Sequence, residues 1–268
     1  MRPGVDSKAR SEVRLRTGVG TVPRMTVVPG LTCPAIPDRL DAIDWPGVEA
    51  DLDLDGWARI PALLSPSESR AVASLYPDDA IFRSRVVMAR HGFGRGEYKY
   101  FAYPLPGIVG QLRAAFYPRL RDIANRWSEA LGHEAWFPEN HDDFLVRGRA
   151  AGQTRPTPLL LQYGQGDYNC LHQDLYGQHV FPLQVAVLLA APGVDFSGGE
   201  FVLTEQRPRM QSKVAVVPLT QGDAVIFAVH NRPVRGARGF YRVNMRHGVS
   251  RVKGGQRHTL GVIFHDAA

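Results

Sequence analysis

Short apolar runs separated by turn residues dominate the second half of the chain. Runs of this length at close intervals are typical of β-strands in a sandwich, a barrel or a jelly roll. In each of these folds, alternate residues of a strand line the interior of the protein. Eight strands are predicted after residue 150, in the segments TPLLLQY, YNCLHQDL, FPLQVAVLLA, GEFVLTE, KVAVVPL, DAVIFAV, FYRVNMRH and HTLGVIFH.

The first half of the chain follows helical patterns instead. Ser65, Pro66 and Glu68 have the residue types and spacing of a capping box with proline at the first helical position. They predict a helix that ends near Tyr76. Apolar residues at helical spacing predict a longer helix within residues 106–132.

Residues 81–106 lie between these two helices and predict two strands joined by a glycine-rich loop, a hairpin that could act as a lid. The chain is therefore predicted to be mainly β with flanking α. We expect a basic tail without apolar periodicity at residues 1–30, a helical region with the hairpin lid at residues 31–150, and a β-rich core at residues 151–268, on which the helices pack.

The chain has a formal charge of +6 and a pI near 9.5, which is compatible with a polyanionic partner such as nucleic acid. Much of the surplus lies in residues 1–24, where six basic residues stand against Asp6 and Glu12. This segment is predicted to be disordered. Because Met25 precedes the first apolar run, the alternative is that the tail results from the choice of start site.

Cysteine content and hydropathy favour an intracellular protein. Cys33 and Cys170 are the only cysteines, and their separation fits neither a disulfide scaffold nor a structural zinc site. The sequence has no apolar run of about 18 residues and no signal-like N-terminus, so no membrane partner is expected. We expect a cytoplasmic location, and the sequence leaves the oligomeric state open.

His172 and Asp174 stand one residue apart in the segment NCLHQDLYG. If this segment is a strand, both side chains point to the same face and can bind one metal ion together. Cys170 shares this predicted face, where we expect a small buried thiol rather than a metal ligand. A second pair with the same spacing, His141 and Asp143, has the composition of a solvated first turn of a helix. The β-rich context therefore favours His172 and Asp174.

A third metal ligand has to come from another strand. His247 ends the predicted strand FYRVNMRH, whereas His230 lies in the turn-like segment HNRP. Two histidines and one carboxylate on one face of a metal ion leave coordination positions open for a substrate, as in non-haem Fe(II) oxygenases. Zinc is the alternative metal, although a structural zinc site is usually richer in cysteine. The full set of candidates is His179, His230, His247, His258 and His265.

Arg257 begins the last predicted strand, ten residues after His247, and can enter the same interior. A buried guanidinium binds a carboxylate through paired, charge-assisted hydrogen bonds. This is what 2-oxoglutarate needs, since its keto acid binds iron and its far carboxylate needs a cation. The alternative is an exposed arginine at the start of a strand.

Together, His172, Asp174, His247 and Arg257 resemble the iron and 2-oxoglutarate residues of the Fe(II)/2-oxoglutarate-dependent oxygenases, and DFSGGEFVLTE resembles a stretch of prolyl-hydroxylase-like members. More narrowly, a bacterial group of uncharacterised oxygenases described as acting on damaged DNA is similar over about residues 45–268. The segments that carry this likeness are FRSRVVMARHGFGRGEYKYFAYPLP, GDYNCLHQDLYG, GGEFVLTEQRPRMQS and RHGVSRV. The resemblance implies a double-stranded β-helix, or jelly-roll, core with N-terminal helices packed on it.

The resemblance also implies the cofactors Fe(II), 2-oxoglutarate and O2. The expected enzyme is a dioxygenase that couples substrate oxidation to the release of succinate and CO2, with the hard chemistry supplied by the cofactor. Tyr163 and Thr259, on the predicted inward faces of their strands, are candidates for further contacts to the cosubstrate. A core aromatic is an equally good interpretation of Tyr163.

Three classes of function are compatible with this sequence. An enzyme that dealkylates damaged or single-stranded DNA has to hold a base outside the stack, and Arg95, Tyr98 and Tyr100 of the hairpin are candidates for this contact. A hydroxylase of a protein residue or a small molecule would use the same metal site with a different rim. A non-catalytic jelly-roll binding protein is the distant alternative, because the conjunction of metal-binding residues and arginine argues for catalysis.

Overall fold

The computed structural model describes residues 35–133 and 136–268. These residues belong to one compact unit, and the boundary expected near residue 150 stays a prediction. The predicted basic tail at residues 1–30 and Cys33 lie outside the described residues. No helix in the described part of the chain is long and apolar enough to cross a membrane.

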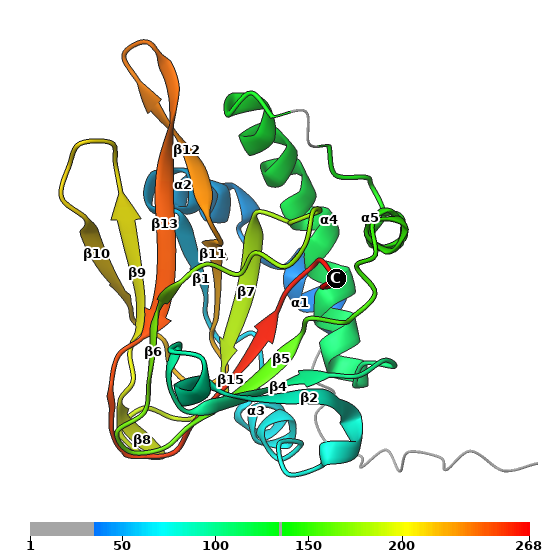
Figure 1. Ribbon diagram of the computed structural model, residues 1–268, viewed down its shortest axis with the longest axis vertical. Helices are drawn as coiled ribbons and strands as arrows, with labels where there is room; N and C mark the ends of the chain where they lie inside the picture. Colours follow the sequence, from blue (N-terminus) through cyan, green and yellow to red (C-terminus); the bar gives the residue numbers. More distant parts are fainter. Residues whose placement is uncertain (1–34, 134–135) are drawn as a thin grey trace, which may run out of the picture. The chain divides into compact units, whose positions relative to one another are not determined.

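Two antiparallel sheets form the core (Figure 1). In spatial order, the seven-stranded sheet consists of β1 (Trp57–Ile60), β11 (Ala224–Ala228), β7 (Leu183–Leu188), β15 (Arg257–Val262), β5 (Leu159–Tyr163), β4 (Glu97–Phe101) and β2 (Phe82–Val87). The six-stranded sheet consists of β10 (Lys213–Val217), β9 (Phe201–Gln206), β13 (Gly239–Val249), β6 (Tyr168–His172) and β3 (Gly94–Arg95), with β12 (Asn231–Gly236) paired to β13. A small sheet pairs β8 (Phe196–Gly198) with β14 (Val252–Gly255).

Helices pack on one face of the seven-stranded sheet (Figure 1). Phe116 and Leu120 from the longest helix share one apolar cluster with Val185 and Leu260 from the sheet. The helices are α1 (Ile36–Asp41), α2 (Trp45–Asp55), α3 (Pro66–Ala73), α4 (Gly107–Ala130) and α5 (His141–Ala150), with short 3-10 helices η1 (Asp79–Ile81) and η2 (Met88–Arg90).

The opposite face of the seven-stranded sheet meets the six-stranded sheet. Ala186 and Phe227, which alternate with the helix-facing residues, pack against Phe201 and Leu203 of β9. Residues of β7 are therefore buried on both faces, which explains its unbroken apolar run. The space between the sheets is the interior into which inward-facing polar residues of both sheets project.

The predicted fold class, mainly β with flanking helices, is confirmed, and each of the eight predicted strands is present. The capping box of Ser65 and Glu68 is also present at the start of α3. That helix ends at Ala73 rather than near Tyr76, because Leu75 and Tyr76 bond to carbonyls only three residues back. The longer predicted helix is α4, which continues through Pro118.

The predicted hairpin is present as β2 and β4, but both strands belong to the seven-stranded sheet, where β4 pairs with β5. Its glycine-rich connection contains β3, which pairs with β6 of the other sheet. Gly94 has a φ of 128°, and a Cβ there would lie 2.4 Å from the carbonyl oxygen of Tyr168. Only glycine allows this approach, so the loop joins the two sheets at one end of the interior.

Candidate metal centre

His172 and His247 lie opposite each other on the antiparallel strands β6 and β13. Two pairs further along, Asn169 lies opposite Val249, so three steps along β6 match two steps along β13. This β-bulge places Asn169 and His172 on the same face, although strict alternation would separate them. The imidazole rings of His172 and His247 consequently approach to 4.2 Å between centroids.

The structure corrects two expectations for the segment around His172. Cys170 is exposed rather than buried on the inward face, because the extra residue breaks the alternation that we assumed. Strand β6 ends at His172, so Asp174 follows the strand and does not owe its direction to strand geometry. The local chain after His172 has to turn Asp174 towards the interior.

The side chains of His172, Asp174 and His247 nevertheless converge, with their ligand atoms within 4.8 Å of one another. Asp174 places Oδ1 at 3.5 Å from Nε2 of His172 and Oδ2 at 3.4 Å from Nε2 of His247. Nδ1 of His172 lies 2.8 Å from the carbonyl oxygen of Cys170. Because a carbonyl only accepts, Nδ1 carries the proton and the lone pair of Nε2 is free for a metal ion.

Electrostatics favour the protonation states that bind metals. Burial alone raises the pKa of Asp174, but the hydrogen bond and charge of His247 outweigh burial and hold that pKa below its usual range. Burial lowers the pKa of the His247 imidazole, and the nearby His172 lowers it further. An ionised carboxylate beside a neutral imidazole is the donor set that a divalent metal requires.

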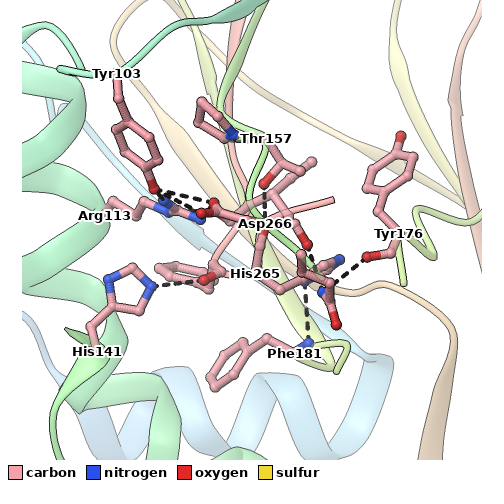
Figure 2. A network of polar contacts seen from close by, with 12 residues as sticks. Tyr103, Arg113, His141, Thr157, Tyr176, Phe181, His265 and Asp266 are labelled. Carbon is pink, nitrogen blue, oxygen red and sulfur yellow. Dashed lines mark hydrogen bonds and ion pairs between the residues drawn. The ribbon is translucent and has the colours of Figure 1, made fainter. Parts of the chain in front are cut away.

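The second His-x-Asp pair begins α5, as predicted, but His141 is half-buried rather than solvated. Its Nε2 lies 2.7 Å from the carbonyl oxygen of Phe264, a contact marked by the dashed line at His141 in Figure 2. Its ring centroid lies 4.7 Å from that of Tyr117. Burial lowers the pKa of His141 to about 3. The local sequence could not show this, because the covering residues come from the far end of the chain.

A cavity of about 200 Å3 lies between the two sheets, next to the three converging side chains. The predicted cosubstrate residues Arg257, Tyr163 and Thr259 line this cavity. Its walls are otherwise mainly apolar and aromatic, with contributions from Phe93, Tyr98, Leu159, Leu161, Phe201 and Phe227. The structure therefore brings the predicted metal-binding and cosubstrate residues into one space.

Arg257 is 1% exposed and has no carboxylate partner among the described residues. The other two buried arginines each have one, since Arg113 pairs with Asp266 and Arg232 pairs with Glu205. Burial lowers the pKa of Arg257 to about 10, so the guanidinium stays charged at neutral pH. A buried cation without a counter-ion is costly, and a bound carboxylate would compensate it. The site thus fits an acidic cosubstrate.

Two further residues hold the guanidinium in place. Nη1 of Arg257 donates a hydrogen bond of 2.6 Å to Oγ1 of Thr259. The guanidinium carbon lies 5.5 Å from the ring centroid of Tyr163, within the range of a cation–π contact. The Nε of Arg257 is buried and has no partner among the described residues, so it can still donate to a ligand.

The three predicted substrate residues do not lie together in the cavity. Tyr98 lines the cavity. Tyr100 does not line it, but packs edge-on against the ring of Tyr98, at 5.3 Å between the ring centroids. Arg95 lies outside the cavity lining, with its Nε at 4.0 Å from Asp167. Of the three, Tyr98 alone has direct access to a ligand in this space.

Tyr176 and Gln184 are two of the cavity residues that the sequence analysis did not identify. The hydroxyl of Tyr176 donates a hydrogen bond of 2.6 Å to Oδ1 of Asp174. Gln184 is 4% exposed, lines the cavity, and its Oε1 has no partner among the described residues. The sequence does contain a signal for Gln184, because a polar residue inside the apolar run LQVAVL indicates a buried polar contact. It contains no such signal for Tyr176, since the role of Tyr176 depends on the turn after β6.

A family model described as "Oxygenase, catalysing oxidative methylation of damaged DNA" matches residues 96–267. An uncharacterized protein of Mycobacterium tuberculosis is 49% identical over 168 residues, which is 63% of this chain and 72% of that protein. The family model covers β4 and every later strand of the two sheets, together with all the residues that line the cavity except Phe93.

Solved structures with similar folds include two prolyl hydroxylases. A Pseudomonas putida prolyl-4-hydroxylase has a TM-score of 0.51 at 15% identity, covering 84% of this chain and 99% of that chain. A Trichoplax adhaerens prolyl hydroxylase in complex with a hypoxia inducible factor peptide fragment has a TM-score of 0.53 at 15% identity, covering 86% and 90%. The likeness confirms the predicted double-stranded β-helix fold.

Proposed function

The chain belongs to the oxygenase family that this model describes, and we propose that it dealkylates damaged nucleic acid by oxidation. Fe(II), 2-oxoglutarate and O2 are the cofactors that the site supports. The observation that carries the proposal is the cavity, where three converging metal-binding side chains and the unpaired cation of Arg257 face the same space. The family description supports damaged DNA as the substrate.

His172, Asp174 and His247 are the proposed ligands of the iron. Together they would hold the metal through two imidazole nitrogens and one carboxylate oxygen, the donor set of non-haem Fe(II) oxygenases. When bound, Fe(II) supplies the oxidation of substrate by O2, with 2-oxoglutarate converted to succinate and CO2. The hydrogen bond from Tyr176 occupies one lone pair of Asp174 and fixes the carboxylate orientation.

Arg257 is the proposed partner of the far carboxylate of 2-oxoglutarate. Thr259 accepts from one guanidinium nitrogen, which aims the remaining N–H groups. Tyr163 accepts a hydrogen bond of 3.4 Å from Nδ2 of Asn169, so its own O–H is available to the cosubstrate. Burial raises the pKa of Tyr163, which keeps this hydroxyl protonated as a donor.

Apolar and aromatic walls suit the face of an unstacked base, and Phe93, Tyr98 and Leu161 provide them here. In the proposed reaction, one oxygen atom of O2 enters a C–H bond of an N-methyl group, and the other ends in succinate. The N–C bond of the hydroxymethyl product then breaks. Formaldehyde leaves, and the hydroxyl proton passes to the base nitrogen, which restores the unmodified base.

Mass spectrometry of N-methylated single-stranded oligonucleotides, incubated with protein, Fe(II) and 2-oxoglutarate in air, tests this function. We expect loss of the methyl group, with formaldehyde and additional succinate formed in equal amounts. If succinate forms from 2-oxoglutarate but methylated oligonucleotides neither lose methyl groups nor stimulate it, the substrate is not nucleic acid. A hydroxylase of a protein residue or a small molecule would then be the better assignment.

A further inference from the structure

We propose that a second, arginine-lined pocket binds backbone phosphates of the nucleic acid and directs the strand to the catalytic cavity. This inference rests on the proposed function for the identity of its ligand. The pocket has a volume of about 370 Å3 and lies where the β9–β10 and β12–β13 hairpins meet. Its lining residues, none of them acidic, are Gln206, Arg207, Pro208, Arg209, His230, Asn231, Arg242 and Asn244.

The register of three neighbouring strands builds the floor of this pocket. Asn244 of β13 lies opposite Gln206 of β9 on one side and opposite Asn231 of β12 on the other. Arg242 lies two residues before Asn244, on the same outward face of β13. A row of neutral amides is therefore flanked by guanidinium groups. Figure 1 shows the two hairpins projecting at the same end of the molecule.

The charge around the pocket is strongly one-sided. Between Gln206 and His265 the sequence has nine arginines and two lysines, but only one acidic residue, Asp223. Among the described residues, Arg209 and Arg242 have no ion-pair partner; Arg207 pairs with Glu205. That carboxylate is 5% exposed and also pairs with the buried Arg232, so the surface keeps a positive charge.

A direct contact connects this pocket with the catalytic cavity. Gln173, which follows His172 and lines the cavity, donates hydrogen bonds of 3.0 Å to Oδ1 of Asn244 and 2.7 Å to the carbonyl of Met245. Asn244 in turn lines the arginine pocket. Along β13, Arg242 and His247 are separated by about 17 Å of extended strand. Because Arg242 faces outward and His247 faces inward, a strand of a few nucleotides would contact both sites by passing over the end of β6, where Gln173 connects them.

Phosphodiesters are the ligand class that this arrangement fits best. Guanidinium groups bind phosphate oxygens in a bidentate way. The Nδ2 of Asn244 can add a hydrogen bond without sequence preference, whereas the Nε2 of Gln206 already donates to the carbonyls of Arg207 and Met210. Contacts of this kind fix the position of the nucleic-acid strand on the protein, while the cavity selects the modified base. An acidic peptide also carries anions, and the experiment below separates it from nucleic acid.

The test compares the double variant Arg209→Ala/Arg242→Ala with a control, Arg70→Ala/Arg149→Ala, which removes two exposed arginines from α3 and α5. Binding to a single-stranded oligonucleotide is measured as a function of salt. The pocket variant should bind at least 10-fold more weakly, and the slope of log K against log salt should fall by about 1.4 for two lost phosphate contacts. The control should bind like the unmodified protein.

Turnover gives a second readout. In the pocket variant, the KM for methylated oligonucleotide should rise while kcat and succinate formation without substrate stay unchanged. If the unmodified protein binds oligonucleotide with salt dependence and the pocket variant binds equally well, the pocket assignment is wrong and the proposed function stands. If the unmodified protein binds no oligonucleotide, both fall. Preference for poly-glutamate over oligonucleotide would assign the pocket to an acidic peptide and overturn the proposal.

Discussion

At the scale of single residues, Asp174 depends on neighbours that lie outside its strand. Its carboxylate accepts a 2.6 Å hydrogen bond from Tyr176. Tyr176→Phe removes this bond with little change of volume, and we expect metal affinity to fall about 10- to 100-fold. Titration with Co(II), followed by absorption, measures the change. Tyr168→Phe, a matched change on β6, should leave the affinity unaltered; equal affinities in all three proteins would remove Tyr176 from the site.

Arg257 is the residue that should set cosubstrate affinity. Arg257→Ala removes a buried cation that faces the cavity, and truncating such a carboxylate partner costs about 2 to 5 kcal/mol. The KM for 2-oxoglutarate should therefore rise by at least about 30-fold. Arg257→Lys should recover part of this loss, since it restores the charge without the paired geometry. The control is Arg251→Ala, which removes an exposed arginine; if that variant raised the KM instead, Arg251 would have the role.

Residue chemistry explains why part of the site was predictable. His172, Asp174, His247 and Arg257 are residue types with few uses inside an apolar core, so their positions in predicted strands indicated a common site. Tyr176 escaped prediction, because its function depends on how the chain turns after β6. The exposure of Cys170 could not be predicted either, because it results from a bulge that no residue type in NCLHQDLYG indicates.

At the scale of elements, one buried ion pair ties the C-terminal segment to α4 (Figure 2). Arg113 and Asp266 are 2.7 Å apart and almost fully buried, and Tyr103 also donates to this carboxylate. Asp266→Ala should lower the free energy of unfolding by about 3 to 5 kcal/mol, because it leaves a buried guanidinium unpaired. Urea unfolding measures this loss.

A surface pair on the same helix provides the control. Asp122 pairs with Arg121 but is mostly exposed. Asp122→Ala should cost less than about 1 kcal/mol, since solvent screens such pairs. If both alanine variants lost the same small amount, the pair of Arg113 and Asp266 would not hold the C-terminal segment in place.

Elements were predictable where a periodic pattern or a capping signal exists, as in α3, α4 and the eight strands predicted after residue 150. Strands β3, β8, β12 and β14 have no such signal, because pairing with other strands rather than local propensity forms them. The role of the glycine-rich hairpin as a lid stays a prediction. The integration of this hairpin into both sheets follows from long-range pairing with β5 and β6.

At the scale of the whole molecule, one half-buried histidine and one buried histidine should make stability depend on pH. Burial lowers the pKa values of His141 and His265 from 6.5 to about 3. As the pH falls below 6.5, these groups take up protons in the unfolded chain but not in the folded one until about pH 3. Stability should therefore decline through this window, by at most about 1.4 kcal/mol per pH unit for each histidine.

Urea unfolding of His141→Gln at pH 6.5 and pH 5 tests this dependence. The variant should lose less stability than the unmodified protein between the two pH values, by up to about 2 kcal/mol. His133→Gln replaces an exposed histidine and should follow the unmodified protein. Parallel declines in all three proteins would contradict a His141 that stays neutral in the folded protein.

The most direct test of the account is the amount of succinate that purified protein forms from 2-oxoglutarate with Fe(II) in air, followed by NMR. We predict slow formation without any other substrate, abolished in His172→Ala and retained in His141→Ala, because only His172 lies within the converging cluster with Asp174 and His247. Succinate formation that survives His172→Ala and disappears in His141→Ala would contradict the account.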